Sequence, residues 1–164
     1  MTTRIGLGFD IHRLVVGDGF RLGGVDVSCA FAVEAHSDGD ALYHALVDAL
    51  MGAAAFGDIG DHYPDTDGRW KDADSRVFVE SAVKAVADAG FTVGNVDANV
   101  FLEAPMLGDL KQDMARNIAD LLCIDVAAVS VKAKTFEGLG PIGTGQAVAA
   151  QVALILVSTS GATS

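Results

Sequence analysis

The chain ends in a long apolar segment that would have to be buried on both faces of a sheet. Between residues 147 and 157, Gln151 is the only polar residue, and the segment is well short of the roughly 20 apolar residues of a membrane helix. We therefore interpret residues 146–157 as a strand. A strand that is apolar on both faces needs cover on both sides of its sheet. One layer of helices covers only one side, so we expect an oligomer to cover the other.

The order of the other apolar patterns predicts an α/β (α+β) two-layer sandwich, in which helices cover one face of a mixed sheet. Alternating patterns predict strands at residues 4–9, 21–27, 96–102 and 129–135. Helical spacing predicts helices capped at Ser37, Asp74 and Asp109, the first with Asp40 in the capping-box position. Polar and glycine-rich stretches predict loops at residues 56–73 and 138–145.

The length predicts one domain, over residues 1–157, followed by a frayed tail over residues 158–164. Hydrophobic residues make up 51% of the chain, which is enough for a sizeable core and excludes disorder. Cys29 and Cys123 are expected to be buried small hydrophobic residues in a reducing compartment, although a disulfide between them stays possible. The sequence enters a strand pattern at once, without a signal sequence, so we expect a cytoplasmic protein.

The charge of the chain excludes two classes of partner. There are 22 Asp and Glu residues against 11 Lys and Arg residues, a net charge of −11. Such a surface repels the phosphates of nucleic acids and of anionic membranes, so we expect neither as a partner. If the substrate is itself an anion, bound metal ions would have to supply the missing positive charge.

Acidic and histidine residues gather in the first part of the chain. All 4 His lie within the first 62 residues, and no Lys or Arg occurs between Leu22 and Gly68. A cluster of acidic residues usually forms a solvated face. Here the mixture of His and carboxylates within glycine-rich turns also fits a metal or catalytic site.

Three residues in this part of the chain could hold a metal ion. Asp10 and His12 are two positions apart at the end of a predicted strand, so their side chains point the same way. His44 lies in the first predicted helix, where Asp40 and Asp48 share its face and could orient the ring. Two His and one carboxylate would leave a fourth position open, as in a catalytic zinc site. The alternative is a His held by local carboxylates without a metal.

Three further groups have both a functional and a structural interpretation. His36 and Ser37 at a helix N-terminus could bind phosphate, or could be an ordinary cap beside a solvated His. The acidic loop at residues 57–67 could bind sugar hydroxyls, or could be a turn-rich surface loop. Thr135 could donate to a phosphate oxygen and Glu137 could hold Mg²⁺, or both could be ordinary surface residues at a strand end.

Taken together, the motifs are far more specific than any one of them. Over residues 4–157 the chain strongly resembles the 2-C-methyl-D-erythritol 2,4-cyclodiphosphate synthase family of the non-mevalonate isoprenoid pathway. The resemblance is carried by Gly8-Phe-Asp-Ile-His12, Ala35-His-Ser-Asp-Gly-Asp40, Gly57-Asp-Ile-Gly60, Pro64-Asp-Thr-Asp67, Asp74-Ser-Arg76 and Ala104-Pro105.

The resemblance implies a homotrimer built around its sheets, with active sites between neighbouring subunits. The implied substrate is a small molecule, 4-diphosphocytidyl-2-C-methyl-D-erythritol 2-phosphate. Its 2-phosphate attacks the β-phosphorus, which gives 2-C-methyl-D-erythritol 2,4-cyclodiphosphate and releases CMP. Such an enzyme is a phosphorus–oxygen lyase.

The resemblance also implies a role for each matching residue. Zinc would be held by Asp10, His12 and His44, and Mg²⁺ or Mn²⁺ by Glu137. The transition state would be stabilised by His36 and Thr135. Substrate would be contacted by Asp10, His12, His36, Ser37, Asp58, Gly60, Tyr63, Asp65, Asp67, Ala104, Pro105, Lys134, Thr135 and Glu137.

Two departures from the family pattern limit what it implies. Met106 stands where relatives often have Lys, which leaves a contact to the cytidylate end of the substrate open. Pro141, Thr144 and Gln146 lie in a loop that lacks the aromatic, Arg and Glu residues of relatives with a ligand in the central channel. The competing hypotheses are a non-catalytic oligomer that binds metal or isoprenoid diphosphates, and a zinc phosphoesterase.

Overall fold

The computed structural model describes residues 2–64 and 66–159 of the chain. Five strands form one sheet in the order β4-β1-β7-β5-β6, and β2 and β3 form a separate hairpin. In chain order the elements are β1 (Thr3–Val16), β2 (Phe20–Leu22), β3 (Val25–Val27), β4 (Phe31–Glu34), α1 (Ala41–Ala54), α2 (Ile59–His62), η1 (Gly68–Trp70), α3 (Arg76–Asp88), β5 (Phe91–Phe101), α4 (Leu110–Leu122), η2 (Val126–Ala128), β6 (Val129–Lys134), α5 (Gly140–Gly143) and β7 (Ala147–Ser158).

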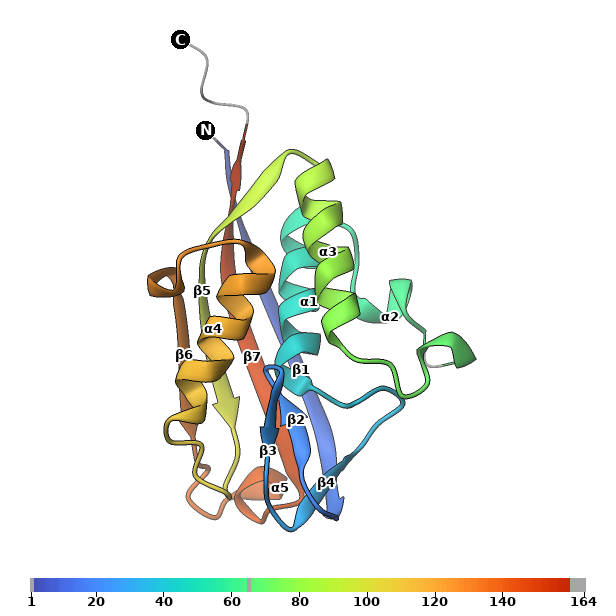
Figure 1. Ribbon diagram of the computed structural model, residues 1–164, viewed down its shortest axis with the longest axis vertical. Coiled ribbons are helices and arrows are strands. Elements are labelled where there is room, and N and C mark those ends of the chain that lie inside the picture. The colour runs from blue at the N-terminus through green and yellow to red at the C-terminus, as the bar shows by residue number, and fades with distance from the viewer. Residues whose placement is uncertain (1, 65, 160–164) are drawn as a thin grey trace.

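The apolar strand at the end of the chain is the centre of the sheet. β7 pairs antiparallel with β1 on one side and with β5 on the other, while β5 and β6 run parallel. The sheet is therefore mixed, as predicted. Three long helices, α1, α3 and α4, lie on the same face of it (Figure 1). No helix of the described residues is long and apolar enough to cross a membrane.

The core lies between the sheet and these helices. Every second residue of β7, from Val148 to Leu156, is fully or almost fully buried, and so are most residues of α1. The opposite face of β1 carries a row of four large apolar side chains that are 46–78% exposed: Ile5, Leu7, Phe9 and Ile11. The predicted uncovered face thus exists in the single chain, and we refer to this row as the open β1 face.

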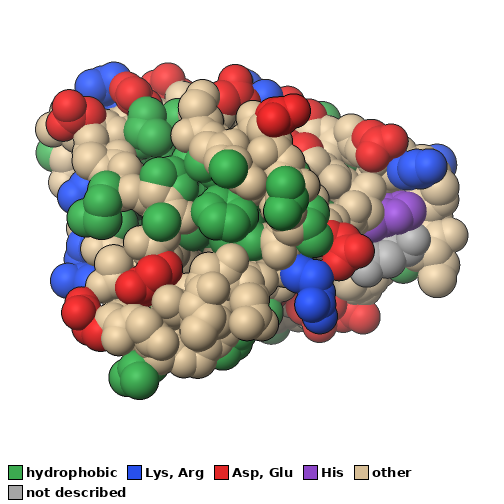
Figure 2. Space-filling model, turned by 90° about the horizontal axis from the view of Figure 1, so that it is seen from below, with side chains coloured by type: hydrophobic (Ala, Val, Ile, Leu, Met, Phe, Trp, Pro, Cys, Tyr) green, Lys and Arg blue, Asp and Glu red, His purple; other side chains and the backbone are tan. Residues whose placement is uncertain are grey.

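A second exposed apolar region lies at the end of the molecule where β1, β5 and β6 finish. Val16 closes β1, and Met106, Phe136 and Leu139 lie in the loops after β5 and β6; all four are exposed. Figure 2 views the molecule from this end and shows hydrophobic side chains gathered near its middle, among charged side chains.

Two glycines let α1 lie directly on β1. A Cβ atom at Gly8 would be 1.9 Å from the carbonyl oxygen of Ala45, and one at Gly6 would be 1.9 Å from that of Ala49. Both contacts are with helix backbone, which cannot move aside as a flexible side chain could. The absence of side chains at these positions therefore sets the distance between helix and strand.

The first long helix begins later than predicted, which corrects the expected role of Ser37. The N-cap is Asp40, whose carboxylate accepts hydrogen bonds from the backbone of Tyr43 at 3.0 Å, Gly23 at 2.8 Å and Gly24 at 2.7 Å. Asp40 thus ties the β2–β3 hairpin to α1 and is fully buried. Burial raises the pKa of this carboxyl, despite the opposing effect of the three N–H donors.

Other differences from the sequence prediction are local. The predicted strand at 21–27 is the β2–β3 hairpin, because Gly23 and Gly24 turn the chain at positive φ. β4 was not predicted, and short helices interrupt both predicted loops. Ser158, expected in the tail, still pairs with Phe91 in the sheet, whereas residues 160–164 of that tail lie outside the described residues. Both cysteines are free thiols, and neither is fully buried as predicted, because Cys29 is half-buried and Cys123 is exposed.

The contact between α1 and β1 predicts opposite effects for two Gly→Ala substitutions. Gly8→Ala should lower the free energy of unfolding by about 2 kcal/mol or more, because the new methyl group collides with the backbone at Ala45. Gly52→Ala, within α1, has no atom within 4 Å of the new Cβ and should raise stability by up to about 1 kcal/mol. Denaturant unfolding of both variants tests this, and equal stabilities would contradict it.

Candidate active site

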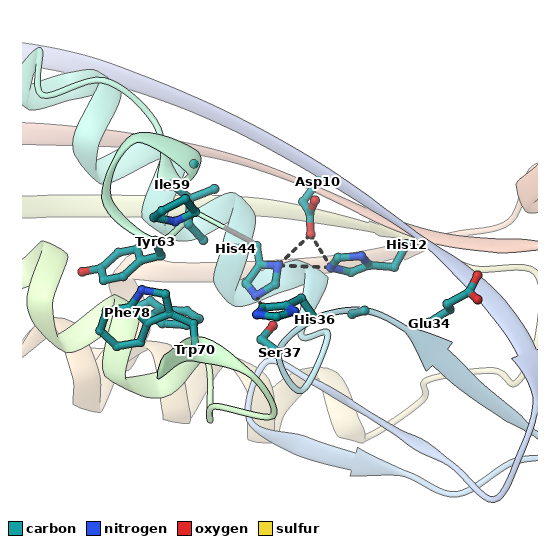
Figure 3. Close-up of a pocket in the computed structure, with 13 residues that line it drawn as sticks. Asp10, His12, Glu34, His36, Ser37, His44, Ile59, Tyr63, Trp70 and Phe78 are labelled. Carbon is teal, nitrogen blue, oxygen red and sulfur yellow. Dashed lines mark hydrogen bonds and ion pairs between the residues drawn. The ribbon is translucent and has the colours of Figure 1, made fainter. Parts of the chain in front are cut away.

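Three side chains converge between β1 and α1. Asp10 and His12 point from β1 toward the helix layer, and His44 points from the first turn of α1 toward them (Figure 3). The Asp10 carboxylate oxygen Oδ2 lies 2.8 Å from Nε2 of His12 and 3.1 Å from Nδ1 of His44. The two ring nitrogens are 3.1 Å apart. The sequence therefore predicted correctly that the three residues meet.

The Gly8 contact explains why they meet. His44 directly precedes Ala45, whose carbonyl oxygen occupies the space above Gly8, and Asp10 is the next residue of β1 on the same side. A side chain at position 8 would lift α1 and separate His44 from the strand.

The outer edge of the His44 ring is held by two serine hydroxyls, and the sequence analysis assigned a role to only one of them, Ser37. Nε2 of His44 lies 2.8 Å from the hydroxyl of Ser75 and 3.2 Å from that of Ser37. The Ser75 hydroxyl in turn donates to Asp38. The prediction that Asp40 and Asp48 orient the His44 ring is wrong. The Asp40 carboxylate accepts from the β2–β3 hairpin, and the Asp48 carboxylate accepts from the backbone N–H of Ile59 at 2.8 Å.

The hydrogen bonds of His44 direct its inner nitrogen, Nδ1, toward Asp10 and His12. Nε2 has hydroxyl partners on one side of the ring, so Nδ1 is the nitrogen that faces the carboxylate of Asp10. Burial opposes a charge on this ring, but the hydrogen bond and the negative charge of Asp10 outweigh it and raise the pKa of His44. Burial likewise disfavours the charged form of Asp10, yet its hydrogen bonds with both imidazoles hold the pKa of Asp10 far below its usual range.

The geometry of these three atoms fits a metal ion. A tetrahedral zinc ion with bonds of about 2.1 Å separates its ligand atoms by about 3.4 Å. The observed separations of 2.8–3.1 Å need only a small expansion to reach that value. Two imidazole nitrogens and one carboxylate oxygen are also the donor types that zinc prefers. The cluster is therefore a possible metal-binding site.

The three residues lie in the wall of a cavity of about 540 Å³. An aromatic cluster closes one side of it, with the Tyr63 and Phe78 rings 4.5 Å apart and Trp70 packed edge-on against both. Figure 3 shows this cluster on one side of the His44 ring and Glu34 on the other. The cavity is lined by Asp10, His12, Glu34, Ala35, His36, Ser37, His44, Ile59, Gly60, Tyr63, Pro64, Trp70 and Phe78.

The sequence analysis missed several of these lining residues. Glu34, Ile59, Trp70 and Phe78 have no local pattern that separates them from surface or core residues. A hint existed for Trp70 alone, because a single Trp in a polar, acidic loop is unusual.

Two described acidic residues of the loop after α1, Asp58 and Asp67, do not line this cavity. Asp58 caps α2, where its carboxylate accepts from the backbone N–H of Asp61 at 3.1 Å. The carboxylate of Asp67 accepts from Arg69, which lowers the pKa of Asp67. The backbone oxygen of Asp67 lies 3.4 Å from Nε2 of His36. Asp65 lies outside the described residues.

The remaining predicted site residues form a second group at the other edge of the sheet. They follow the parallel strands β5 and β6, whereas the cavity adjoins β1 and α1, and the central strand β7 lies in between. Glu103 fixes the loop after β6 by accepting from the backbone N–H groups of Phe136 at 2.9 Å and Gly138 at 3.2 Å. The Thr135 hydroxyl donates to Glu137 at 2.7 Å. A hollow here is lined by Leu102, Pro105, Met106, Leu107, Ala133, Lys134 and Thr135.

The described residues of one chain therefore present the predicted site in two parts. The first part, which we call the His cavity, contains Asp10, His12, His36, Ser37, His44, Gly60 and Tyr63. The second part, which we call the β6 loop group, contains Ala104, Pro105, Lys134, Thr135 and Glu137.

Comparisons with known proteins agree on one family. The chain is 47% identical over 153 residues to the 2-C-methyl-D-erythritol 2,4-cyclodiphosphate synthase of Solibacter usitatus, covering 93% of this chain and 96% of that protein. It is 49% identical to the bifunctional enzyme IspD/IspF of Albidiferax ferrireducens, covering 95% of this chain but only 37% of that longer protein.

A solved structure supports the same grouping. The structure of the Plasmodium falciparum IspF–CDP complex superposes with a TM-score of 0.84 at 35% identity, covering 95% of this chain and 96% of that one. The pattern of the YgbB family matches residues 3–157. The chain thus belongs to the YgbB family.

Proposed function

We propose that the chain converts 4-diphosphocytidyl-2-C-methyl-D-erythritol 2-phosphate into 2-C-methyl-D-erythritol 2,4-cyclodiphosphate and CMP, in the non-mevalonate isoprenoid pathway. The observation that carries this proposal is the convergence of Asp10, His12 and His44 in a cavity, within a chain that matches cyclodiphosphate synthases over nearly its whole length. The CDP complex of the Plasmodium falciparum relative supports a cytidine diphosphate substrate.

We assign zinc to Asp10, His12 and His44, and Mg²⁺ or Mn²⁺ to Glu137. Divalent cations at these places would neutralise charge on the phosphates and polarise the phosphorus that is attacked. This also answers how a chain with a net charge of −11 binds a polyanion. Bound metal ions would supply the positive charge that the described lining residues of the His cavity lack, since none of them is Lys or Arg.

The protein's own contribution is placement of the substrate. His36 and Ser37 lie beside His44 in the cavity, where an imidazole N–H and a hydroxyl can donate to phosphate oxygens. Gly60, Tyr63 and Pro64 line the part of the cavity that we assign to the methylerythritol end. We assign Asp58, Asp65 and Asp67 to the same end. Phosphoryl transfer depends on positioning and charge stabilisation more than on covalent catalysis, which suits such a site.

We propose that the two parts of the site meet between neighbouring subunits of a homotrimer. Thr135, Lys134 and Glu137 of one subunit would then face the His cavity of the next, and the hollow beside Pro105 and Met106 would receive the cytidine. The separation of the two parts on opposite sides of the central strand β7 supports this arrangement. So does the open β1 face, whose exposed apolar side chains need cover.

One assay separates the proposal from its alternatives. The protein is incubated with the cytidine-linked substrate and Mg²⁺, and phosphorus NMR follows the products. We expect a cyclic diphosphate and CMP in equal amounts. Release of inorganic phosphate would instead identify a zinc phosphoesterase, and unchanged substrate would indicate a non-catalytic binding protein.

His44→Ala should remove zinc and activity while leaving the trimer intact. Three protein ligands leave little redundancy, and the trimer contacts are expected on the open β1 face rather than at the metal. Elemental analysis should find zinc near zero instead of about one ion per chain. His62→Ala is the matched control, because His62 is exposed and bonds only the Phe56 carbonyl among the described residues. Full zinc occupancy in His44→Ala would refute the ligand assignment.

Glu137→Gln should keep zinc but lose most Mg²⁺-dependent turnover, at least about tenfold, because an amide is a poorer ligand for a hard cation than a carboxylate. The rate is measured as a function of Mg²⁺ concentration. Glu80→Gln serves as the control, since Glu80 is a surface residue of α3 paired with Arg76. An unchanged Mg²⁺ dependence would rule out Glu137 as the ligand.

The central channel of the proposed trimer should bind isoprenoid diphosphates weakly or not at all. The resemblance leads us to expect a basic residue near position 144, but the Thr144 hydroxyl there donates within its own turn, to the Gly140 carbonyl at 2.9 Å. Arg binds diphosphates through strong bidentate hydrogen bonds that neither Thr144 nor Gln146 can replace. Native mass spectrometry with farnesyl diphosphate tests this. A tightly held diphosphate, one per trimer, would show that the expectation is wrong.

A further inference from the structure

We propose that Ser75 and Asp38 are positioning residues for the metal site, because they hold the His44 ring with Nδ1 toward Asp10 and His12. This inference rests on the proposed zinc site. Neither residue lines the His cavity, so both act through His44 rather than on substrate.

The contact with Ser75 fixes the outer edge of the ring. The hydroxyl oxygen of Ser75 lies 2.8 Å from Nε2 of His44, on the side of the ring opposite the metal cluster. Ser75 is fully buried, so water does not compete for its hydroxyl. The Ser37 hydroxyl is a second partner of Nε2, at a longer distance of 3.2 Å.

The direction of these hydrogen bonds selects the tautomer of His44. A carboxylate only accepts hydrogen bonds, so the Ser75 hydroxyl donates its one proton in the hydrogen bond to Asp38. The Ser75 oxygen can then only accept from His44, which requires a proton on Nε2. In the neutral ring this leaves the lone pair on Nδ1, the nitrogen that faces Asp10 and His12.

Asp38 is itself held in place by the start of α3. Its carboxylate accepts from both the hydroxyl and the backbone N–H of Ser75, the latter at 3.2 Å. Its own backbone N–H donates to the Ala73 carbonyl at 3.1 Å. These hydrogen bonds join the segment before α1 to the start of α3, next to His44.

The Ser75 side chain makes these contacts instead of capping its own helix. Ser75 is the N-cap residue of α3, a position where a Ser side chain usually accepts from the helix backbone. Its hydroxyl makes no such capping bond among the described residues and instead joins Asp38 to His44. Outer partners of a metal-bound His fix its tautomer and increase its basicity, and their loss commonly lowers metal affinity by about 10–100-fold.

The test compares zinc affinity in Ser75→Ala and wild type, by competition with a chromophoric chelator. We expect Ser75→Ala to bind zinc at least about tenfold more weakly, and Ser37→Ala/Ser75→Ala to bind it more weakly still. Asp38→Asn should lie between wild type and Ser75→Ala, because an amide oxygen still accepts one bond but carries no charge. Ser81→Ala, at an exposed position of the same helix, is the matched control and should bind zinc like wild type.

Two further measurements distinguish positioning from a purely structural role. The visible absorption bands of the Co²⁺-loaded protein should shift in Ser75→Ala but not in Ser81→Ala, because they report the geometry of the ligands. The melting temperatures of the metal-free variants show whether the fold itself is affected. Lower stability together with unchanged zinc affinity and unchanged Co²⁺ bands would overturn the inference. Failure of wild type to bind zinc would overturn the proposed zinc site itself, and this inference with it.

Discussion

Helix α1 lies so close to β1 that the carbonyl oxygens of Ala45 and Ala49 occupy the space where side chains at positions 8 and 6 would begin. This contact brings His44 within hydrogen-bonding distance of Asp10 and makes the three-residue cluster possible. Backbone packed against backbone is a rigid arrangement, because neither partner can change rotamer to relieve a collision. The main chain thus sets how close His44 lies to Asp10.

The cluster also depends on what surrounds it. The Asp10 carboxylate and the two imidazole nitrogens lie within hydrogen-bonding distance of one another. These interactions outweigh the effect of burial, so that the pKa of Asp10 is lowered and the pKa of His44 is raised. The outer edge of His44 is fixed by hydroxyl groups from two other segments, one before α1 and one at the start of α3. Four separate stretches of the chain therefore hold one site together.

The sheet presents two incomplete features that the proposed trimer would complete together. The open β1 face lacks cover, and the His cavity lacks the β6 loop group, which lies at the far edge of the same sheet. Packing of subunits through their sheets would bury apolar area and bring neighbouring edges together. Folding stability and catalysis would then share one interface.

The sequence by itself determined the features that depend on residue spacing. The alternation of Asp10 and His12 places both on one side of a strand, the helical period of apolar residues identifies α1 as a helix, and the apolar β7 has to lie inside a sheet. These follow because strand and helix repeats are local properties of the backbone. The motifs also identified the family.

The tertiary structure decided the contacts between distant segments. Asp40, predicted to support a cap at Ser37 and to orient His44, is itself the N-cap of α1 and also binds the hairpin at Gly23 and Gly24. The Ser75 side chain contacts His44 instead of capping its own helix. The separation of the predicted site into two parts also became visible only in three dimensions. Sequence spacing does not determine such contacts, because the hydrogen-bond partners of a polar side chain come from distant segments. Only the packing of the whole chain brings these segments within hydrogen-bonding distance.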